Sequence, residues 1–442
     1  MAGAPPEKIH LVDAVYGIVR DVPLNYVTRG GVDQRLVDNL TRDKHIVVYG
    51  SSKQGKTCLR KHCLQEDDYI VVQCANRWSL QDIHENVLKR AGFHLTQSEK
   101  KTVSGKNKVN ATAGGKLFGF GVTAGAEHEG GTQTETTRAS LDLDLSDVND
   151  VISALRGIDF KRYIVLEDFH YLPIDTQKDF AVALKAFHET SPFCFIIIGV
   201  WLDENRLIVY NGDLAGRLVA VDADKWKAEE LDAVITVGAT LLNIQFTDKF
   251  KKDLLAESFE SVYIVQEACR QACIRASVTR TQDAFRVIGG DVDVNRLVKE
   301  VVDQQSGRYS AFITNFSGGF QETRLEMYKW LLYPVLTSNQ QKLEEGFRWN
   351  ELRKVLQEHH PAGENFNPGN LSQALVSTTS LQVAKDIKPI ILDYDQTNRR
   401  LNVVDRGFII WLAHQNRADL LEMLEINASD APRPVQPTLP NM

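Results

Sequence analysis

The stretch HIVVYGSSKQGKTCLRKHCL, residues 45–64, carries the strongest structural signal in this chain. Its first part, HIVVYG, is a β-branched run ending in glycine, which is typical of a buried parallel strand. Its last part, CLRKHCL, predicts a helix. Residues 50–57 between them match the pattern G-x-x-x-x-G-K-[ST]. That pattern, placed between a strand and a helix, is typical of a phosphate-binding loop (P-loop).

The chemistry of such a loop depends on its backbone. The glycines let the chain wrap so that its N–H groups and the helix N-terminus point at phosphates. We expect Lys56 to reach the β- and γ-phosphates and the Thr57 hydroxyl to ligate magnesium, so the predicted cofactors are ATP and magnesium. The residues predicted to bind them are Gly50, Ser51, Ser52, Lys53, Gln54, Gly55, Lys56, Thr57 and Cys58.

A second signal is the acidic end of another apolar strand, YIVLEDFHYL, residues 163–172. One carboxylate of Glu167 and Asp168 should hold magnesium, and the other should orient or deprotonate the attacking water. By position, Glu167 takes the metal role and Asp168 the base role, although the reverse assignment stays open. His170 either senses the γ-phosphate or packs nearby.

The pattern around these motifs predicts the fold class. Apolar strands at 45–50, 69–74, 163–168 and 193–201 alternate with helical segments, which is typical of a parallel α/β sheet with helices on both faces. We therefore expect a P-loop ATPase core at 45–226, preceded by a lead-in at 1–44. Residues 96–145 change to glycine-rich and alternating sequence. They predict a β-rich insertion, with a disordered loop as the alternative for 100–115.

The second half of the chain reads differently. Residues 227–310 carry helical patterns only and predict a helical lid. Residues 320–425 predict three helices, two strands and a final helix, and the Pro-rich tail at 429–442 is expected to be disordered.

Composition limits the classes of function. The formal net charge of −7 argues against a chain that coats nucleic acid non-specifically, although it leaves room for a local basic surface. The N-terminus lacks the pattern of a secretory signal, and the most apolar stretch, 193–202, is too short to cross a bilayer. We therefore expect a cytoplasmic protein with no membrane partner. Cys269 and Cys273 lack the further ligands of a zinc site and are expected to be buried thiols.

With both motifs placed, the chain resembles the AAA+/STAND branch of P-loop ATPases, nearest to the archaeal-ATPase and origin-recognition-like members. The segments that carry the resemblance are YVTRGGVDQRL (26–36), the P-loop, IVLEDFHYL (164–172) and NGDLAGRLVAV (211–221). In this family the first segment cradles adenine, and an Arg in the last often reaches a neighbour's ATP. The resemblance therefore implies a homo-oligomer in which Arg217 is that finger. A structural ion pair is the alternative for Arg217.

The chain departs from the family pattern at three places. The acidic pair reads Glu-Asp where the family usually has Asp-Glu. In the lid, Tyr263 falls near the position of an Arg that contacts ATP. The polar first sensor after the fourth strand is not obvious, with Asp203 and Asn205 as candidates. These departures predict slow hydrolysis.

The C-terminal order of elements resembles a winged helix, which in some relatives reads DNA. Residues 346–442 hold ten Lys/Arg against eleven Asp/Glu, and the third helix has almost no basic residue. A protein partner is therefore at least as well supported as DNA. The basic residues that could serve a wing are Lys385, Lys388, Arg399, Arg400 and Arg406.

These features favour an ATP-binding, oligomerising switch that engages a partner through its winged helix or its insertion. An ATP-controlled DNA-binding loader or transposition accessory is one alternative, and a sensor of a bacterial defence system is another. A small-molecule kinase is less favoured, because it needs neither the lid nor the C-terminal module.

Overall fold

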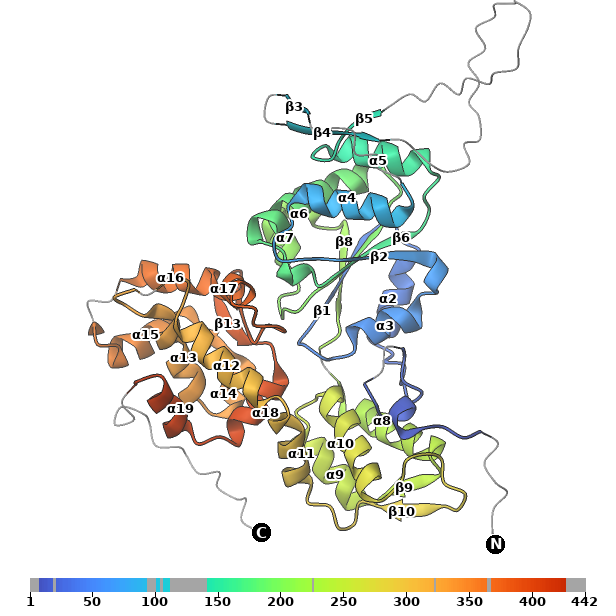
Figure 1. Ribbon diagram of the computed structural model, residues 1–442, viewed down its shortest axis with the longest axis vertical. Helices are drawn as coiled ribbons and strands as arrows, with labels where there is room; N and C mark the ends of the chain where they lie inside the picture. The colour runs from blue at the N-terminus through green and yellow to red at the C-terminus, as the bar shows by residue number, and fades with distance from the viewer. Residues whose placement is uncertain are drawn as a thin grey trace, which may run out of the picture.

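The computed structural model describes residues 8–18, 21–93, 101–103, 106–111, 141–224, 226–321, 323–363 and 367–426. The predicted tail at 429–442 and the motif LFGFGV (117–122) lie outside these residues. Figure 1 shows three lobes: the P-loop domain, a lid of helices below it, and a C-terminal module beside it. No helix in the described ranges is long and apolar enough to cross a membrane.

A parallel five-stranded sheet organises the P-loop domain. Its strands are β1 (His45–Tyr49), β2 (Tyr69–Gln73), β6 (Tyr163–Glu167), β7 (Phe195–Ile198) and β8 (Leu218–Asp222). They lie in the order β2-β6-β7-β1-β8, all parallel. The predicted P-loop α/β fold is therefore confirmed, and β8 adds a fifth strand beside β1. Because the strands are parallel, the P-loop after β1 and the acidic pair after β6 emerge at the same edge of the sheet.

Helices cover both faces of this sheet. On one face, α2 (Asp33–Leu40) and α3 (Lys56–Cys63) bury Leu36 and Leu59 against the β-branched strands. On the other face lie α4 (Leu80–Ala91), α5 (Val148–Gly157) and α6 (Ile174–Thr190). Ser79 caps α4 in a capping box with Asp82, as its position predicts. This three-layer packing fixes the edge at which the loops of the site meet.

The insertion is β-rich where it is described. Strands β3 (Lys101–Val103), β4 (Lys106–Ala111) and β5 (Leu141–Asp144) form an antiparallel sheet in the order β3-β4-β5. It lies at the end of the molecule opposite to the lid (Figure 1). The alternating residues Leu141–Asp144 thus form a strand within the region predicted to be β-rich.

The lid contains more than helices. Its helices are α8 (Ala228–Leu241), α9 (Asp248–Glu257), α10 (Val262–Arg275), α11 (Val294–Asp303) and α12 (Ser306–Ser317). Between them, β9 (Ile244–Phe246) pairs in parallel with β10 (Arg286–Ile288). The prediction of helices only was therefore wrong, because three-residue strands are too short to show a period of two. Cys269 and Cys273 are buried in α10, as expected.

The C-terminal module contains the predicted elements in the predicted order. Its elements are α13 (Met327–Thr337), α14 (Gln340–Glu345), β11 (Phe347–Arg348), α15 (Trp349–His359), α16 (Pro368–Val376), α17 (Thr378–Ala384), β12 (Leu392–Asp395), β13 (Arg400–Val403), α18 (Arg406–Ala413) and α19 (Arg417–Met423). Of these, α14, β11 and α19 are additional elements that were not predicted. Strands β11, β13 and β12 form an antiparallel sheet. The third predicted helix is two helices, α16 and α17, divided at Ser377.

The lid and the C-terminal module share one hydrophobic core. A continuous cluster of buried residues runs from α1 (Val12–Val15) through α8–α12 to α18 and α19. Tyr309 of α12, for example, packs against Phe408 and Trp411 of α18. The sheet has two separate cores on its own faces. The chain is thus built as a P-loop domain joined to one larger helical body.

Candidate nucleotide-binding site

The P-loop adopts a backbone that its glycines make possible. Gly50 has a φ of 143°, and a Cβ there would lie 2.8 Å from the backbone nitrogen of Asp224. Gly55 has a φ of 80° and caps the N-terminus of α3 in the left-handed conformation. A side chain is strained at both positions. The loop therefore wraps around the first turn of α3, as a phosphate site requires.

Several polar groups of this loop form hydrogen bonds within the protein. The Ser51 N–H donates to Asp224 Oδ1 at 2.6 Å, and the Ser52 N–H donates to the carbonyl oxygen of Val404 at 3.0 Å. The Lys56 ammonium donates to the carbonyl oxygens of Gly50, at 2.9 Å, and of Ser51. Groups that would otherwise meet a phosphate are thus satisfied from within the chain.

Lys56 is buried in this arrangement. Burial lowers its pKa to about 8, against the opposing influence of Asp224 and Glu167. A phosphate beside the ammonium would restore the charged form, because an opposite charge stabilises it. At neutral pH, Lys56 is therefore a buried cation whose charge an anionic ligand would stabilise.

The two carboxylates after β6 occupy different positions. Glu167 Oε2 accepts a hydrogen bond from the Thr57 hydroxyl at 3.4 Å, while Oε1 accepts one from Arg60 Nε at 2.9 Å. Asp168 has a φ of 57° and accepts a hydrogen bond from the Gln73 amide, and burial raises its pKa. The position of Glu167 beside Thr57 supports the predicted metal role, and the raised pKa of Asp168 suits a base.

The donor set beside the loop fits magnesium. Thr57 and Glu167 present a hydroxyl and a carboxylate oxygen, the hard oxygen ligands that Mg²⁺ prefers. Within the described ranges no group of three or more His, Cys, Asp or Glu side chains could hold a metal ion by itself. Magnesium usually takes one or two protein ligands and completes its shell with phosphates and water.

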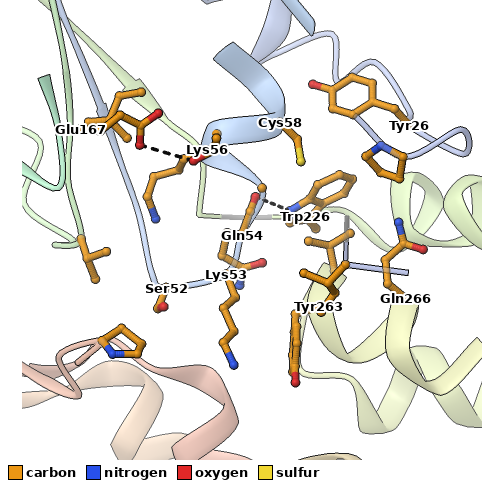
Figure 2. A pocket seen from close by; sticks show the side chains of 18 of the residues that line it. Tyr26, Ser52, Lys53, Gln54, Lys56, Cys58, Glu167, Trp226, Tyr263 and Gln266 are labelled. Carbon is orange, nitrogen blue, oxygen red and sulfur yellow. Dashed lines mark hydrogen bonds between the residues drawn. The ribbon is translucent and has the colours of Figure 1, made fainter. Parts of the chain in front are cut away.

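A cavity of about 390 Å³ extends from these groups toward the lid. Lys56 and Glu167 lie at one end, and Tyr26, Trp226 and Gln266 lie at the other (Figure 2). The far end is mostly apolar, with Val27, Val234 and Val262 in its wall. A mostly apolar slot with a few polar groups has the character of a site for a nucleotide base.

One polar pair interrupts the apolar end. Asn25 and Gln266 exchange two amide hydrogen bonds of 2.9 Å, and Asn25 also donates to the Val234 carbonyl oxygen at 3.2 Å. Tyr26 stacks on His62 with ring centroids 4.2 Å apart. Tyr26 and Val27 belong to the segment predicted to cradle adenine, and both line the cavity.

The candidate sensor residues lie in different places. Tyr263, which falls near the position of a family Arg in the sequence, lines the cavity, with Lys53 Nζ 4.1 Å above its ring. Asp203 and Asn205 do not line it, and Asp203 instead accepts hydrogen bonds from the Asn205 N–H and from Thr397. The residues after β7 that reach the cavity are Gly199 and Val200, which carry no polar side chain.

His170 lines the same cavity from the short 3-10 helix Phe169–Tyr171 after β6. Its imidazole is 2% exposed, and neither ring nitrogen has a hydrogen-bond partner. Burial, reinforced by the charge of Lys56, holds its pKa well below the usual range. His170 is therefore neutral and carries one donor and one acceptor.

Arg217 lies at the other edge of the sheet. It precedes β8, and its carbonyl oxygen accepts the N–H of His45 at the start of β1, whereas the P-loop follows the end of β1. Its guanidinium pairs with Glu189 at 2.8 Å and donates to the Asp213 carbonyl oxygen. The geometry keeps Arg217 from its own chain's site, so a role in catalysis needs a second copy.

The C-terminal module reaches the site directly. Besides the bond from Ser52 to Val404, Arg406 donates to Asp224 Oδ2 at 2.9 Å and to the Phe259 carbonyl oxygen at 2.8 Å. Burial alone would raise the pKa of Asp224, but Arg406 and the Ser51 N–H hold it below its usual range. Arg406 was predicted for a wing. It instead begins α18 and is mostly buried, because it pairs with an acidic side chain of the P-loop domain.

Most of the residues predicted to bind phosphate and magnesium lie together around this cavity. Predicted residues that line the cavity are Ser52, Lys53, Gln54, Gly55, Lys56, Thr57, Cys58, Glu167 and Asp168. Gly50 and Ser51 shape the loop behind it. Residues that sequence reasoning missed are Asn25, Arg60, Asp224, Trp226, Gln266 and Val404. Of these residues, only Arg60 could have been found from the sequence, because it lies one helical turn after Thr57.

No protein-family model matches this sequence, and no curated protein matches it. Among solved structures, the chain is similar to the Walker-type ATPase of Pyrococcus abyssi, with 10% identity, a TM-score of 0.49, and coverage of 90% of this chain and 99% of that one. It is also similar to the ORC2 protein of Aeropyrum pernix, with 13% identity, a TM-score of 0.42, and coverage of 96% and 98%.

A third similar structure is the STAND protein with a tetratricopeptide repeat sensor from Pyrococcus horikoshii. It has 12% identity and a TM-score of 0.37, and the match covers 90% of this chain and 44% of that one. What this chain binds and does is inferred from its own side chains.

Proposed function

We propose that this chain is an ATP-binding, ATP-hydrolysing switch of the AAA+/STAND kind, in which nucleotide binding changes the position of the C-terminal module. The observation that carries the proposal is the 3.0 Å hydrogen bond from the Ser52 N–H of the P-loop to Val404 of the module. A phosphate that takes this N–H competes with the module for it. Binding and module position are then linked, because each changes the free energy of the other.

The chemistry assigned to the site uses residues already in place. Lys56 and the P-loop N–H groups bind the phosphates, Thr57 and Glu167 hold magnesium, and Asp168 orients the attacking water. When bound, magnesium neutralises charge on the β- and γ-phosphates. The apolar slot beside Trp226 takes the base. Hydrolysis should disappear in Lys56→Ala, and full activity in that variant would contradict the site assignment.

Other contacts hold the module against the P-loop domain. Arg206 and Asp393 form a buried ion pair across the interface, and Thr379 donates to the same carboxylate at 3.0 Å. Thr397, in the β12–β13 turn, donates to Asp203 at 3.4 Å. Contacts of this kind must break together when the module moves, so they set the cost of opening.

The proposal is tested by weakening the interface away from the cavity. In Asp393→Asn, the buried pair is broken, and ATP should bind about five- to tenfold more tightly because less of its binding energy is spent on opening. Calorimetric titration measures this, and hydrogen exchange should show ATP exposing residues 386–408 in the wild type. Lys185→Ala, which breaks an exposed pair within the P-loop domain, is the control. Unchanged affinity and unchanged exchange would refute the coupling.

The partner and the assembly belong to the same proposal. A finger role for Arg217 requires a second copy of the chain, so we infer that ATP favours oligomers.

The C-terminal module, proposed as a winged helix, then presents to a partner the surface that now faces the P-loop domain. Arg399 and Arg400 pack on Trp349 and on the Glu345 carbonyl oxygen, and Arg406 is buried. A protein partner is therefore favoured over DNA.

A further inference from the structure

His170 is a buried polar side chain that the proposed chemistry does not use. In the part of the chain that the structure describes, only His170 and Gln54 combine fully buried, unpartnered side-chain nitrogen or oxygen atoms with a place in the wall of the cavity. Gln54 belongs to the phosphate loop already assigned. His170 comes from a different element, the 3-10 helix after β6, and leaves both ring nitrogens without a partner.

A packing role accounts poorly for this residue. An unpartnered buried polar group costs about 1–3 kcal/mol, so an apolar ring of similar size would be more stable at the same place. The neighbouring Phe169 and Tyr171 show that aromatic rings fit here, and the His170 and Tyr171 ring centroids are 4.0 Å apart. Buried groups that lack partners point to a ligand that supplies them.

The position of His170 selects which part of a ligand it meets. The base slot at Tyr26 and Trp226 and the acidic end at Glu167 lie at opposite ends of the cavity (Figure 2). His170 lines the acidic end, next but one to Asp168 and close enough to Lys56 for their charges to interact. In a nucleoside triphosphate, the terminal phosphate lies farthest from the base.

The described residues that follow β7 are the other candidates for a contact with the terminal phosphate, but they present no polar side chain to the cavity. At the end of β7, beside β6 in the sheet, only Gly199 and Val200 reach the cavity after the strand. Asp203, which follows them, is turned away to the Asn205 N–H and Thr397. Among the described residues that follow β6 and β7 and line the cavity, the side chains that can donate a hydrogen bond to an anion are His170 and Tyr171, and of these only His170 has buried polar atoms without a partner.

We propose that His170 donates a hydrogen bond to the terminal phosphate of a bound nucleoside triphosphate and so distinguishes it from a diphosphate. The inference rests on the proposed function, since it needs a nucleotide in this cavity. His170, on the short 3-10 helix after β6, is then the side chain that distinguishes the triphosphate-bound state of the switch from the diphosphate-bound state.

Two variants test this assignment. His170→Phe keeps a ring but removes the donor, and His170→Gln keeps an N–H donor. Dissociation constants are measured by calorimetry for ADP and for a non-hydrolysable ATP analogue, each with magnesium. His170→Phe should weaken the analogue about tenfold or more, as expected for one lost hydrogen bond to a charged group, while ADP stays within about twofold. His170→Gln should recover most of the loss.

Stability separates this role from a structural one. Because the imidazole is unpartnered without ligand, His170→Phe should melt no lower than the wild type when nucleotide is absent. His84→Phe, a buried imidazole of α4 outside the cavity, should leave the ratio of analogue to ADP affinity at the wild-type value.

Three results would overturn the inference: equal losses for ADP and analogue, unchanged affinity for the analogue, or a lower melting temperature with the nucleotide ratio intact. If the wild type binds neither nucleotide, the proposed function itself fails, which is a different outcome.

Discussion

At the scale of single residues, Lys56 makes nucleotide binding depend on pH. Its pKa of about 8 in the free protein means that it loses its proton above that pH. A bound phosphate favours the charged form, so binding at higher pH must take up a proton. We expect uptake of about 0.9 proton at pH 9 and about 0.1 at pH 7, with affinity falling as pH rises above 8. Calorimetry in buffers of different ionisation enthalpy measures the uptake.

The control for this prediction is Lys53. Burial lowers its pKa to about 8 as well, and it also lines the cavity. Lys53→Gln should keep the proton uptake if Lys56 is its source. Loss of the uptake in that variant would assign the proton to Lys53 instead.

Sequence predicts some residues of the site better than others for a physical reason. The P-loop residues are contiguous, so their pattern is visible in a single stretch. Asn25 and Gln266, in contrast, are 241 positions apart and meet only because the lid packs on the lead-in. Asp224 accepts the Ser51 N–H with its carboxylate and Val404 accepts the Ser52 N–H with its carbonyl oxygen, and both residues lie far from the P-loop in the sequence. Polar contacts between residues far apart in the sequence were therefore not predictable and are seen only in the structure.

At the scale of elements, the strands that could be predicted were those with long, regular sequence patterns. The long β-branched runs of β1, β2, β6 and β7 are buried on both faces and stand out, whereas β9 and β10 are three residues each and do not. The third helix predicted for the C-terminal module is divided at Ser377, and Thr378, the first residue of α17, donates its hydroxyl to the carbonyl oxygen of Ala374. Serine and threonine offer the backbone such alternatives, and a helical period does not reveal which one wins.

Helix α3 illustrates how one element builds the metal side of the site. Thr57 and Arg60, one turn apart on this helix, meet the two oxygens of Glu167, and the Arg60–Glu167 pair is almost wholly buried. Removing one partner leaves a buried charge uncompensated. Arg60→Leu should therefore lower the free energy of unfolding by about 3–5 kcal/mol without nucleotide.

Chemical denaturation measures the effect of Arg60→Leu. Lys249→Ala breaks an exposed pair on α9 and should leave the unfolding midpoint unchanged. An Arg60→Leu variant as stable as the wild type would show that Glu167 is not held as an ion in the free protein.

At the scale of the whole molecule, the lid and the C-terminal module behave as one packed body. Their shared core joins α8–α12 to α18, while the contacts of this body with the P-loop domain combine ion pairs, as in Arg406–Asp224 and Arg206–Asp393, with a small apolar cluster around Val200 and Val404. A body with a continuous apolar core is expected to move as a unit, and small mixed interfaces between domains open more readily. The division predicted between lid and winged helix therefore marks a change of topology more than a hinge.

The same scale decides the role of Arg217, which lies at the sheet edge opposite to the P-loop and pairs with Glu189. If it completes the site of a second copy, Arg217→Ala and Lys56→Ala should each be inactive alone, yet recover activity when mixed. Random pairing places an intact Lys56 opposite an intact Arg217 in about a quarter of the interfaces, so about a quarter of wild-type ATPase activity should return. The chain carrying both substitutions, mixed with Lys56→Ala, should recover none, because no interface then contains both side chains. Glu189→Gln breaks the same ion pair from its other side and should keep activity if the guanidinium acts on a neighbour's phosphate. Activity lost in Glu189→Gln as well as in Arg217→Ala, with no recovery on mixing, would assign Arg217 to the structural ion pair.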